Sequence, residues 1–349
     1  MATSPEYRRD PVTGRWVIIA PERASRPLGL ADTKPHARRN IERDECPFCE
    51  GHEHDTPHES YAVRTPGTAP NGPGWQLRVV PNKFPAVRAT ADSDLKSTGE
   101  LFESFPGFGV HELVIECPFH ESSPTVLTDG EYARVLVAYR ERIRTLADDP
   151  RFAYVTVFKN VGAEAGASLA HLHSQLIATP IVPDAVRLEL EAAGDYYLGE
   201  RRCVFCAVVK AELAGRTRLV AETAHFVAFC PFAARFAYEV WVVPKRHASG
   251  YESTSDADLL ELSGLMKLVL GKIDSALGDP AYNYYLHTSP ARIRDLPYYH
   301  WHFEILPRTS RQAGFEWGSG CFINLVPPER SARDLRAAEI RPDIDILGR

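Results

Sequence analysis

Apolar residues recur at helical spacing in two long stretches of the 349-residue chain. The first stretch, about 129–147, places six apolar residues on one helical face, namely Tyr132, Val135, Leu136, Tyr139, Ile143 and Leu146. The second, about 257–277, does the same with Leu259, Leu262, Met266, Val269, Leu270 and Ile273. Thr254 or Ser255 could cap this second helix. The pattern predicts two long amphipathic helices that each bury one face.

Each predicted helix is followed by the same three features. Asp149-Pro150 and Asp279-Pro280 stop the helices, 153–159 and 282–288 have strand composition, and a His-x-His motif comes next. From the proline to the first histidine the interval is 21 residues in one half (150 to 171) and 20 in the other (280 to 300). This spacing predicts an internal repeat. We expect an N-terminal domain at 1–190 and a C-terminal domain at 191–349, joined by the helix-like segment 183–202.

Composition narrows the possible functions. Hydrophobic residues at 44% and charged residues at 25% are typical of a globular protein, and a net charge of −6 leaves no basic excess for a nucleic-acid surface. The chain has no run of about 18 apolar residues that would predict a membrane span. Its first residues also lack the apolar core of a secretory signal. We therefore expect a protein of the reducing cytoplasm with no nucleic-acid or membrane partner.

Four of the seven cysteines form two Cys-x-x-Cys pairs, Cys46/Cys49 and Cys203/Cys206, one in each half. Disulfide frameworks are unusual in a reducing compartment, so metal binding is favoured. Each pair has two histidines at matching intervals, His120 to His171 (51 residues) and His247 to His300 (53 residues). Two thiolates and two imidazoles suit tetrahedral Zn²⁺. The repeat therefore predicts two zinc sites.

Two alternatives to this assignment stay open in the sequence. Both cysteine pairs could be incidental reduced thiols. In addition, His52, His54 or His58, which lie in a polar loop, could compete as a ligand of the first zinc. Four protein ligands for each ion would leave no position for substrate or water, so either zinc would be structural.

The first His-x-His motif lies in a segment suited to phosphate chemistry. His171 and His173 are two residues apart, so on a strand both face one side, and Gln175 is next on that side. If His171 binds zinc, His173 is free to attack phosphorus as a neutral imidazole. Small residues before it allow backbone N–H groups to approach phosphate oxygens: Gly162, Gly166, Ala167 and Ser168. This pattern predicts a covalent bond to His173, which divides one transfer into two in-line displacements.

These motifs resemble the histidine-triad superfamily, in its galactose-1-phosphate uridylyltransferase branch, over nearly the whole chain. FKNVGAEAGASLAHLHSQ (158–175) matches the active-site segment and RRDPVTGRWVIIAPERASRP (8–27) the opening of that branch. CPFC (46–49) resembles its first metal pair, and VVPNKFPAV (79–87) its nucleotide-binding strand and loop. The resemblance implies an α+β fold of two similar repeats whose antiparallel strands merge into one sheet flanked by helices. It also implies a homodimer.

Matched motif by motif, the resemblance implies roles for individual residues. His173 would form the nucleotidyl intermediate, and Gln175 and Ser168 would hold the phosphoryl group. The nucleotide and its phosphates would be bound by a further set, namely Arg23, Asn82, Phe84, Asn160 and Gly166.

Departures from the family pattern bear on the substrate. Uridylyltransferases usually read His-Pro-His-Gly-Gln where this chain reads His-Leu-His-Ser-Gln, and their second metal usually binds one Glu and three His. Both departures resemble the ADP-glucose phosphorylase branch, which transfers AMP between sugar phosphate and inorganic phosphate. Glu316 matches a hexose-contacting position, and Phe322 stands where uridylyltransferases typically have a sugar-binding Gln.

The leading prediction is transfer of a nucleoside monophosphate from a nucleotide sugar to a sugar 1-phosphate, as in a UDP-glucose:hexose-1-phosphate uridylyltransferase. The enzymatic alternatives are an ADP-glucose phosphorylase, with phosphate as acceptor, and a dinucleoside polyphosphate phosphorylase. A metal-braced module that only senses nucleotides is the non-enzymatic alternative. His302 occupies the position equivalent to the nucleophile in the second half. We expect a structural role for it, because Phe303-Glu304 replaces the Ser-Gln pair.

Overall fold

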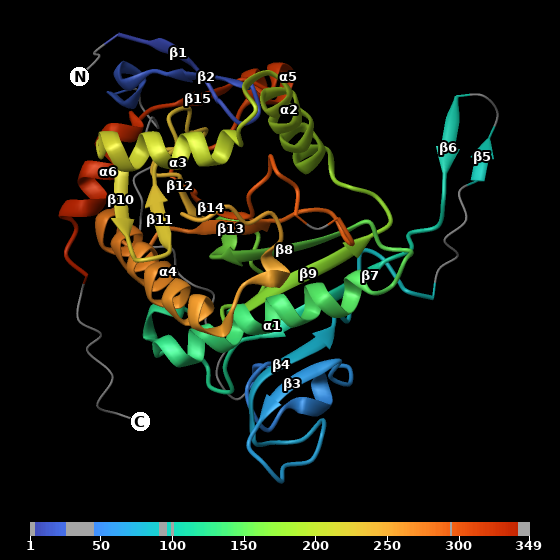
Figure 1. Ribbon diagram of the computed structural model, residues 1–349. Coiled ribbons are helices and arrows are strands. Elements are labelled where there is room, and N and C mark those ends of the chain that lie inside the picture. The colour runs from blue at the N-terminus through green and yellow to red at the C-terminus, as the bar shows by residue number, and fades with distance from the viewer. Residues whose placement is uncertain (1–3, 26–44, 91–95, 99–100, 294, 341–349) are drawn as a thin grey trace.

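The centre of the protein is one antiparallel sheet of ten strands. The computed structural model describes residues 4–25, 45–90, 96–98, 101–293 and 295–340 (Figure 1). From edge to edge the strands run β3 (Tyr61–Arg64), β4 (Trp75–Pro81), β7 (Val110–Ile115), β9 (His173–Thr179), β8 (Tyr154–Val161), β13 (Tyr282–His287), β14 (His302–Pro307), β12 (Val240–Pro244), β11 (Phe226–Phe229) and β10 (Leu219–Glu222).

The strand order shows the internal repeat directly. Strands β3-β4-β7-β9-β8 of the first half correspond to β10-β11-β12-β14-β13 of the second, and the halves join where β8 pairs with β13. Asn160 lies opposite Asn283 at this junction. Strand β9 begins at His173 and β14 at His302, the second histidine of each His-x-His motif. The predicted α+β fold with two repeats merged into one sheet is confirmed.

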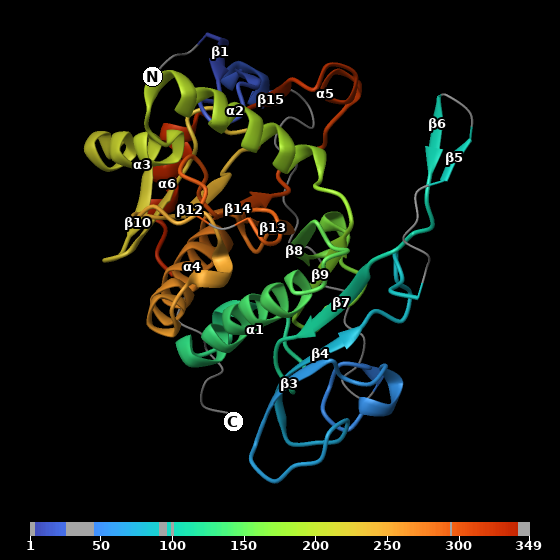
Figure 2. The same ribbon diagram turned by 45° about the vertical axis from the view of Figure 1, so that its right-hand side comes forward.

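Two long helices, α1 (Asp129–Ala147) and α4 (Asp256–Leu277), pack against each other on one face of the sheet (Figures 1 and 2). Their apolar stripes belong to one buried cluster with alternate strand residues. Thr128 and Glu131 form a capping box at the start of α1, and Ser255 rather than Thr254 caps α4. Each cap satisfies backbone N–H groups that have no partner within the helix.

The opposite face of the sheet is covered differently in the two halves. Helices α2 (Asp184–Glu200) and α3 (Val204–Gly215) cover the second half, where Phe205, Val227 and Trp241 share a cluster. Over the first half, the loop of Cys46–Cys49 packs with Trp75 and Ile115. The helix-like segment predicted at 183–202 is α2, which contains the predicted domain boundary at 190. Helix α3 begins at Val204, inside the second Cys-x-x-Cys pair.

The two ends of the described chain meet in a second, smaller sheet. Strand β1 (Glu6–Arg9) pairs with β2 (Trp16–Ile19), and β2 pairs in parallel with β15 (Phe322–Asn324). Helix α5 (Gly314–Ser319) precedes β15, and α6 (Pro328–Ala337) follows it and contacts α4. A hairpin of β5 (Lys96–Thr98) and β6 (Phe102–Ser104) projects from the body of the molecule (Figure 2).

Among the described residues, every helix is too short or too polar to cross a membrane.

Candidate active site and metal centres

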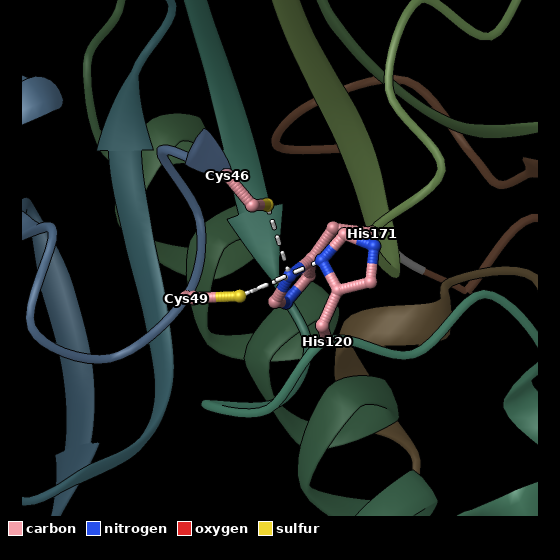
Figure 3. A group of neighbouring side chains, drawn as sticks. All are labelled: Cys46, Cys49, His120 and His171. Carbon is pink, nitrogen blue, oxygen red and sulfur yellow. Dashed lines mark hydrogen bonds between the residues drawn. The ribbon is translucent and has the colours of Figure 1, made fainter. Parts of the chain in front are cut away.

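The first cysteine pair lies within reach of two histidines. Cys46 Sγ is 3.5 Å from His171 Nδ1, and Cys49 Sγ is 3.5 Å from His120 Nδ1 and 3.6 Å from His171 Nδ1 (Figure 3). All four candidate ligand atoms lie within 4.8 Å of one another. Bonds of about 2.3 Å to sulfur and about 2.0 Å to nitrogen would separate the ligand atoms of a tetrahedral ion by roughly 3.5 Å. The residues predicted from the sequence therefore form a cluster that could hold a metal.

A hydrogen bond beside the first cluster orients His171 toward the cysteines. His171 Nε2 donates to the carbonyl of Cys117 at 2.9 Å, so Nδ1 presents its lone pair to the cysteines. Burial lowers the pKa of His171 to about 3, which keeps the ring neutral. His52 donates to the carbonyl of Cys46 at 2.7 Å instead of joining the cluster, and His54 is exposed.

The second predicted cluster also forms. Cys206 Sγ lies 3.6 Å from His247 Nδ1 and 3.3 Å from His300 Nε2, and Cys203 completes the set. The two imidazole nitrogens are 3.0 Å apart. This cluster is more open than the first, because His247 is exposed and Cys206 is half-buried.

A third group of possible ligands was not foreseen from the sequence. Glu189, His287, His302 and Glu304 are all buried and converge within 4.8 Å. Both carboxylates have partners in the chain: Glu189 accepts from His287 at 2.9 Å, and Glu304 accepts from the half-buried Arg235. Burial disfavours ionisation of Glu304, but the charge of Arg235 and the contact with His302 hold the pKa of Glu304 below its usual value. The group therefore has internal charge compensation.

His302 belongs to this third group. Its Nδ1 bonds the carbonyl of His300 at 3.1 Å, and its Nε2 lies 3.4 Å from Glu304, an ion-pair distance. Glu304 thus occupies the place that Gln175 has in the first half, and Arg235 pairs with its carboxylate at a pocket that both residues line. The expected structural role of His302 stays a prediction that this packing supports.

His173 is buried at the start of β9, beside the first metal cluster. Its Nδ1 donates to the carbonyl of His171 at 2.7 Å, which leaves the lone pair on Nε2. Burial lowers the pKa of His173, so the ring is held neutral. The ring of Phe48 packs edge-on against both histidines. His171 itself precedes the strand, although we expected both histidines to lie on it.

A buried ion pair contacts the backbone carbonyl of His173. Lys159 Nζ donates to Glu116 at 2.7 Å and to the carbonyl of His173 at 3.2 Å. Both side chains are at least 99% buried, and burial lowers the pKa of Lys159. The neighbouring Ser174 accepts from Tyr139 at 2.7 Å. Neither Lys159 nor Glu116 was recognised in the sequence, because they pair only when β7 and β8 flank β9.

A pocket opens in front of His173 and is lined by residues 159–163 and 167–173 together with Ser122. Asn160 and Ser168, both predicted to bind phosphate, are part of its wall. Gly162 and Gly166 have φ values of +82° and +88°, which side chains rarely adopt. Asn160 Oδ1 accepts from Asn283 at 2.7 Å, and Asn283 also donates to the carbonyl of Ala165 at 2.8 Å. The second half of the chain therefore holds the glycine-rich turn in place.

His111 lies between Gln175 and Asn82. His111 Nε2 is 2.9 Å from Gln175 Oε1 and 3.1 Å from Asn82 Nδ2. His111 also bonds the backbone of both Asn82 and Ala86. Phe84, in the same loop, is 84% exposed. The predicted nucleotide loop thus lies beside the predicted phosphoryl ligand.

Three predicted residues do not gather at this pocket. Arg23 is exposed in a 3-10 turn (Pro21–Ser25) at the N-terminal end, and Phe322 packs against Phe236 in the small sheet. Glu316 accepts from the backbone N–H of Ala313 at the start of α5. In both views of the fold, α5 and β15 lie at the top of the molecule, whereas β9 lies in its middle (Figures 1 and 2).

Comparisons with known proteins agree with this fold. The model of the family "Galactose-1-phosphate uridyl transferase, N-terminal domain" matches residues 1–183, and a domain of unknown function matches 120–341. ADP-glucose phosphorylase from Arabidopsis thaliana is 40% identical and aligns over 97% of this chain and 94% of its own length. Galactose-1-phosphate uridylyltransferase from Thermotoga maritima is 30% identical over 96% and 99%.

Comparison with solved structures agrees with these sequence similarities. The crystal structure of the Arabidopsis thaliana ADP-glucose phosphorylase with bound ADP-glucose superposes with a TM-score of 0.82 at 38% identity, covering 96% of this chain and all of that one. A uridylyltransferase structure superposes at 0.74 with 30% identity, over 95% and 98%. The chain belongs to the galactose-1-phosphate uridylyltransferase family. It is an enzyme of this group of nucleotidyltransferases and phosphorylases.

Proposed function

We propose that the protein transfers a nucleoside monophosphate from a nucleotide sugar through a covalent bond to His173. The observation that carries this proposal is the 2.7 Å bond from His173 Nδ1 to the carbonyl of His171. It selects the tautomer whose Nε2 lone pair is available at the pocket. The same carbonyl would stabilise the positive charge that the ring gains when Nε2 forms a bond.

The transfer takes place in two displacements. In the first, Nε2 of His173 forms a bond to the α-phosphorus while the bond from that phosphorus to the bridging oxygen breaks, and the sugar 1-phosphate leaves with the electron pair. In the second, an oxygen of the acceptor attacks the same phosphorus, the P–N bond breaks, and the imidazole returns to its starting state. No net proton change is required when a phosphate oxyanion is the acceptor.

The residues around the pocket divide between phosphate and nucleoside. Ser168, Asn160 and the backbone at Gly166 would bind the phosphate oxygens, and Gln175 would donate to the phosphoryl group during transfer. The loop that contains Asn82 and Phe84 would contact the ribose and base, where an exposed aromatic ring can stack.

We propose Zn²⁺ for both Cys2His2 clusters, since two thiolates and two imidazoles match its preferred ligands and geometry. Four protein ligands make each ion structural. At the first cluster the ion would fix His171, and with it the carbonyl that orients His173. Reduced cysteine ligands fit the predicted cytoplasmic location.

ADP-glucose is the donor and phosphate the acceptor that the similarities favour. The ADP-glucose phosphorylase is 40% identical, compared with 30% for the uridylyltransferase of Thermotoga maritima. The second Cys-x-x-Cys pair and the His-Leu-His-Ser-Gln motif point the same way. The second candidate is uridylyl transfer between UDP-glucose and a hexose 1-phosphate, which the family match favours.

Arg23, Glu316 and Phe322 lie away from the pocket of their own chain, so we propose a homodimer in which a second copy brings them to the substrate. Sedimentation of the purified protein tests this assembly. A monomer at concentrations where the enzyme is active would exclude it.

The covalent step is tested by intact-protein mass spectrometry after mixing the enzyme with ADP-glucose or UDP-glucose and no acceptor. We expect a mass increase of one nucleoside monophosphate, lost on mild acid treatment and missing in His173→Ala. His302→Ala is the matched control and should still form the adduct if folded. An unmodified wild-type enzyme with both donors, or an adduct that persists in His173→Ala, would exclude the mechanism.

The acceptor is identified by adding phosphate or galactose 1-phosphate to the labelled enzyme. Formation of ADP from the ADP-glucose adduct with phosphate is the expected result. Preferential discharge of a uridylyl adduct to galactose 1-phosphate would instead establish the second candidate.

A further inference from the structure

The amide of Gln175 can adopt two orientations, and only one of them is useful for the proposed contact with phosphate. The NH₂ group donates to a phosphoryl oxygen, whereas the carbonyl oxygen would repel it. The two orientations have nearly the same shape, so the neighbours of the amide must decide between them. The neighbour of Gln175 is His111, across the pairing of β7 with β9.

The protonation of His111 follows from its backbone contact. The N–H of Ala86 donates to His111 Nδ1 at 3.1 Å, and a backbone N–H can act only as a donor. Nδ1 therefore carries the lone pair, and the neutral ring has its proton on Nε2. That Nε2 lies 2.9 Å from Gln175, so the atom of Gln175 that faces it must be the acceptor Oε1.

We infer that His111 is a positioning residue for the transfer reaction: it binds the carbonyl of Gln175 and so turns the Gln175 NH₂ group toward the phosphoryl group. This inference rests on the proposed function of His173 and Gln175. His111 does not touch the reacting atoms. It acts through Gln175, as outer ligands of a catalytic group do.

The same ring connects the nucleotide loop to the catalytic amide. Asn82 donates its backbone N–H to the carbonyl of His111 at 2.8 Å, and Ala86 donates to the ring. Asn82 Oδ1 accepts from the N–H of Phe84 at 2.9 Å, which directs the Asn82 NH₂ group toward the protonated Nε2 of His111. The Asn82 NH₂ group and the Nε2–H of His111 are both donors, so their contact is unfavourable. A bound nucleotide that accepts from Asn82 would relieve this contact. Binding of the nucleoside and alignment of Gln175 are thus joined at one side chain.

Two substitutions separate the functions of the ring. His111→Asn keeps an acceptor near the position of Nδ1 and removes the donor to Gln175. His111→Gln keeps a donor near the position of Nε2 and removes the acceptor for Ala86. The measurements are the single-turnover rate of adduct formation on His173 at saturating ADP-glucose, and the KM for that donor.

We expect His111→Asn to lower the adduct rate by about 10- to 100-fold with little change in KM. His111→Gln should keep most of the wild-type adduct rate and raise the KM for ADP-glucose, because the hydrogen bond that it loses, to Ala86, holds the nucleotide loop. A merely structural role would lower the rate and the thermal stability in both variants alike. His225→Asn, a change at a mostly exposed histidine of the second half, is the matched control and should match the wild type.

A double-mutant cycle with Gln175→Ala tests whether His111 acts through Gln175. In the Gln175→Ala background, His111→Asn should have almost no further effect on the adduct rate. An equal loss in both backgrounds, or a wild-type rate in His111→Asn, would overturn the inference. Absence of any adduct in the wild-type enzyme would instead be a failure of the proposed function, so the two outcomes are distinguishable.

Discussion

At the scale of single residues, the site depends on hydrogen bonds to side chains that could adopt more than one state. Each bond selects one tautomer of a histidine or one orientation of an amide. The carbonyl of His171 selects the tautomer of His173, and the carbonyl of Cys117 selects that of His171. His111 selects the orientation of Gln175. None of these partners reacts. Each removes an alternative that would place the wrong atom at the pocket, which is how pre-organisation lowers a barrier.

The ion pair of Lys159 and Glu116 gives a prediction at this scale. Lys159→Met leaves the Glu116 carboxylate buried without its counter-charge, so it should lower the free energy of unfolding by about 3 to 5 kcal/mol. Urea denaturation measures the change. Adding Glu116→Gln to Lys159→Met should restore part of the stability, because the stranded charge is removed. The matched control is Lys210→Met on the exposed surface, and an equally small loss at both lysines would contradict the prediction.

At the scale of elements, the junction of β8 with β13 joins the two repeats at the phosphate site. Asn283 from the second repeat donates to Asn160 and to the carbonyl of Ala165, and accepts from Arg308 at 2.5 Å. The glycine-rich turn of the first repeat therefore takes its shape partly from a strand of the second. This arrangement makes the glycine-rich turn of the first half incomplete without the second half.

The junction predicts the effect of Asn283→Asp. Aspartate keeps an acceptor for Arg308 but has no NH₂ group for Asn160 or Ala165, so the Asn160 amide loses its fixed orientation. Of the two hydrogen bonds that are lost, the one to Asn160 orients the amide, and a contribution of about 1.4 kcal/mol from it corresponds to about a tenfold slower adduct formation on His173. Quenched-flow measurement of the adduct rate gives the comparison. An unchanged rate in a folded variant would show that Asn160 does not depend on Asn283.

At the scale of the whole molecule, the two halves share one fold but have separate chemistry. In the first half, Gln175 follows the strand-leading His173, and a pocket opens beside it. In the second half, Glu304 follows His302, and Arg235 binds that carboxylate. Cys2His2 clusters that could hold a metal lie at equivalent places in both halves. The internal repeat therefore supplies two Cys2His2 clusters, but the proposed reactive site occurs in the first half alone.

Metal removal should distinguish the roles of the two Cys2His2 clusters. Cys203→Ser is expected to lose one metal ion and thermal stability but to keep adduct formation, because its cluster is remote from the pocket. Cys46→Ser should lose one ion and also form the adduct more slowly, since its cluster holds His171 beside His173.

Metal analysis, thermal unfolding and adduct rates together check this pair of variants. A chelator should also remove the ion of the second cluster first, because His247 is exposed there. Equal loss of adduct formation in both variants would contradict the assignment.

Local patterns in the sequence were sufficient for much of this structure. The stripe of helix α1 and its stop at Asp149-Pro150 follow from side-chain spacing and backbone limits, which need no distant partner. The two Cys2His2 clusters could also be predicted, because a metal's ligand preference and an internal repeat together constrain residues far apart in the chain. The proposed nucleophile followed from the motif around His173.

Only the tertiary structure decided which side chains support that chemistry. His111 with Gln175, Lys159 with Glu116, and Asn283 with Asn160 each meet across neighbouring strands. Such pairs depend on strand order and register, and these are set by the burial of whole faces rather than by any local motif. The chain by itself thus determined its elements, its two Cys2His2 clusters and the histidine that is proposed to react. The folded sheet decided how that histidine and its amides are oriented.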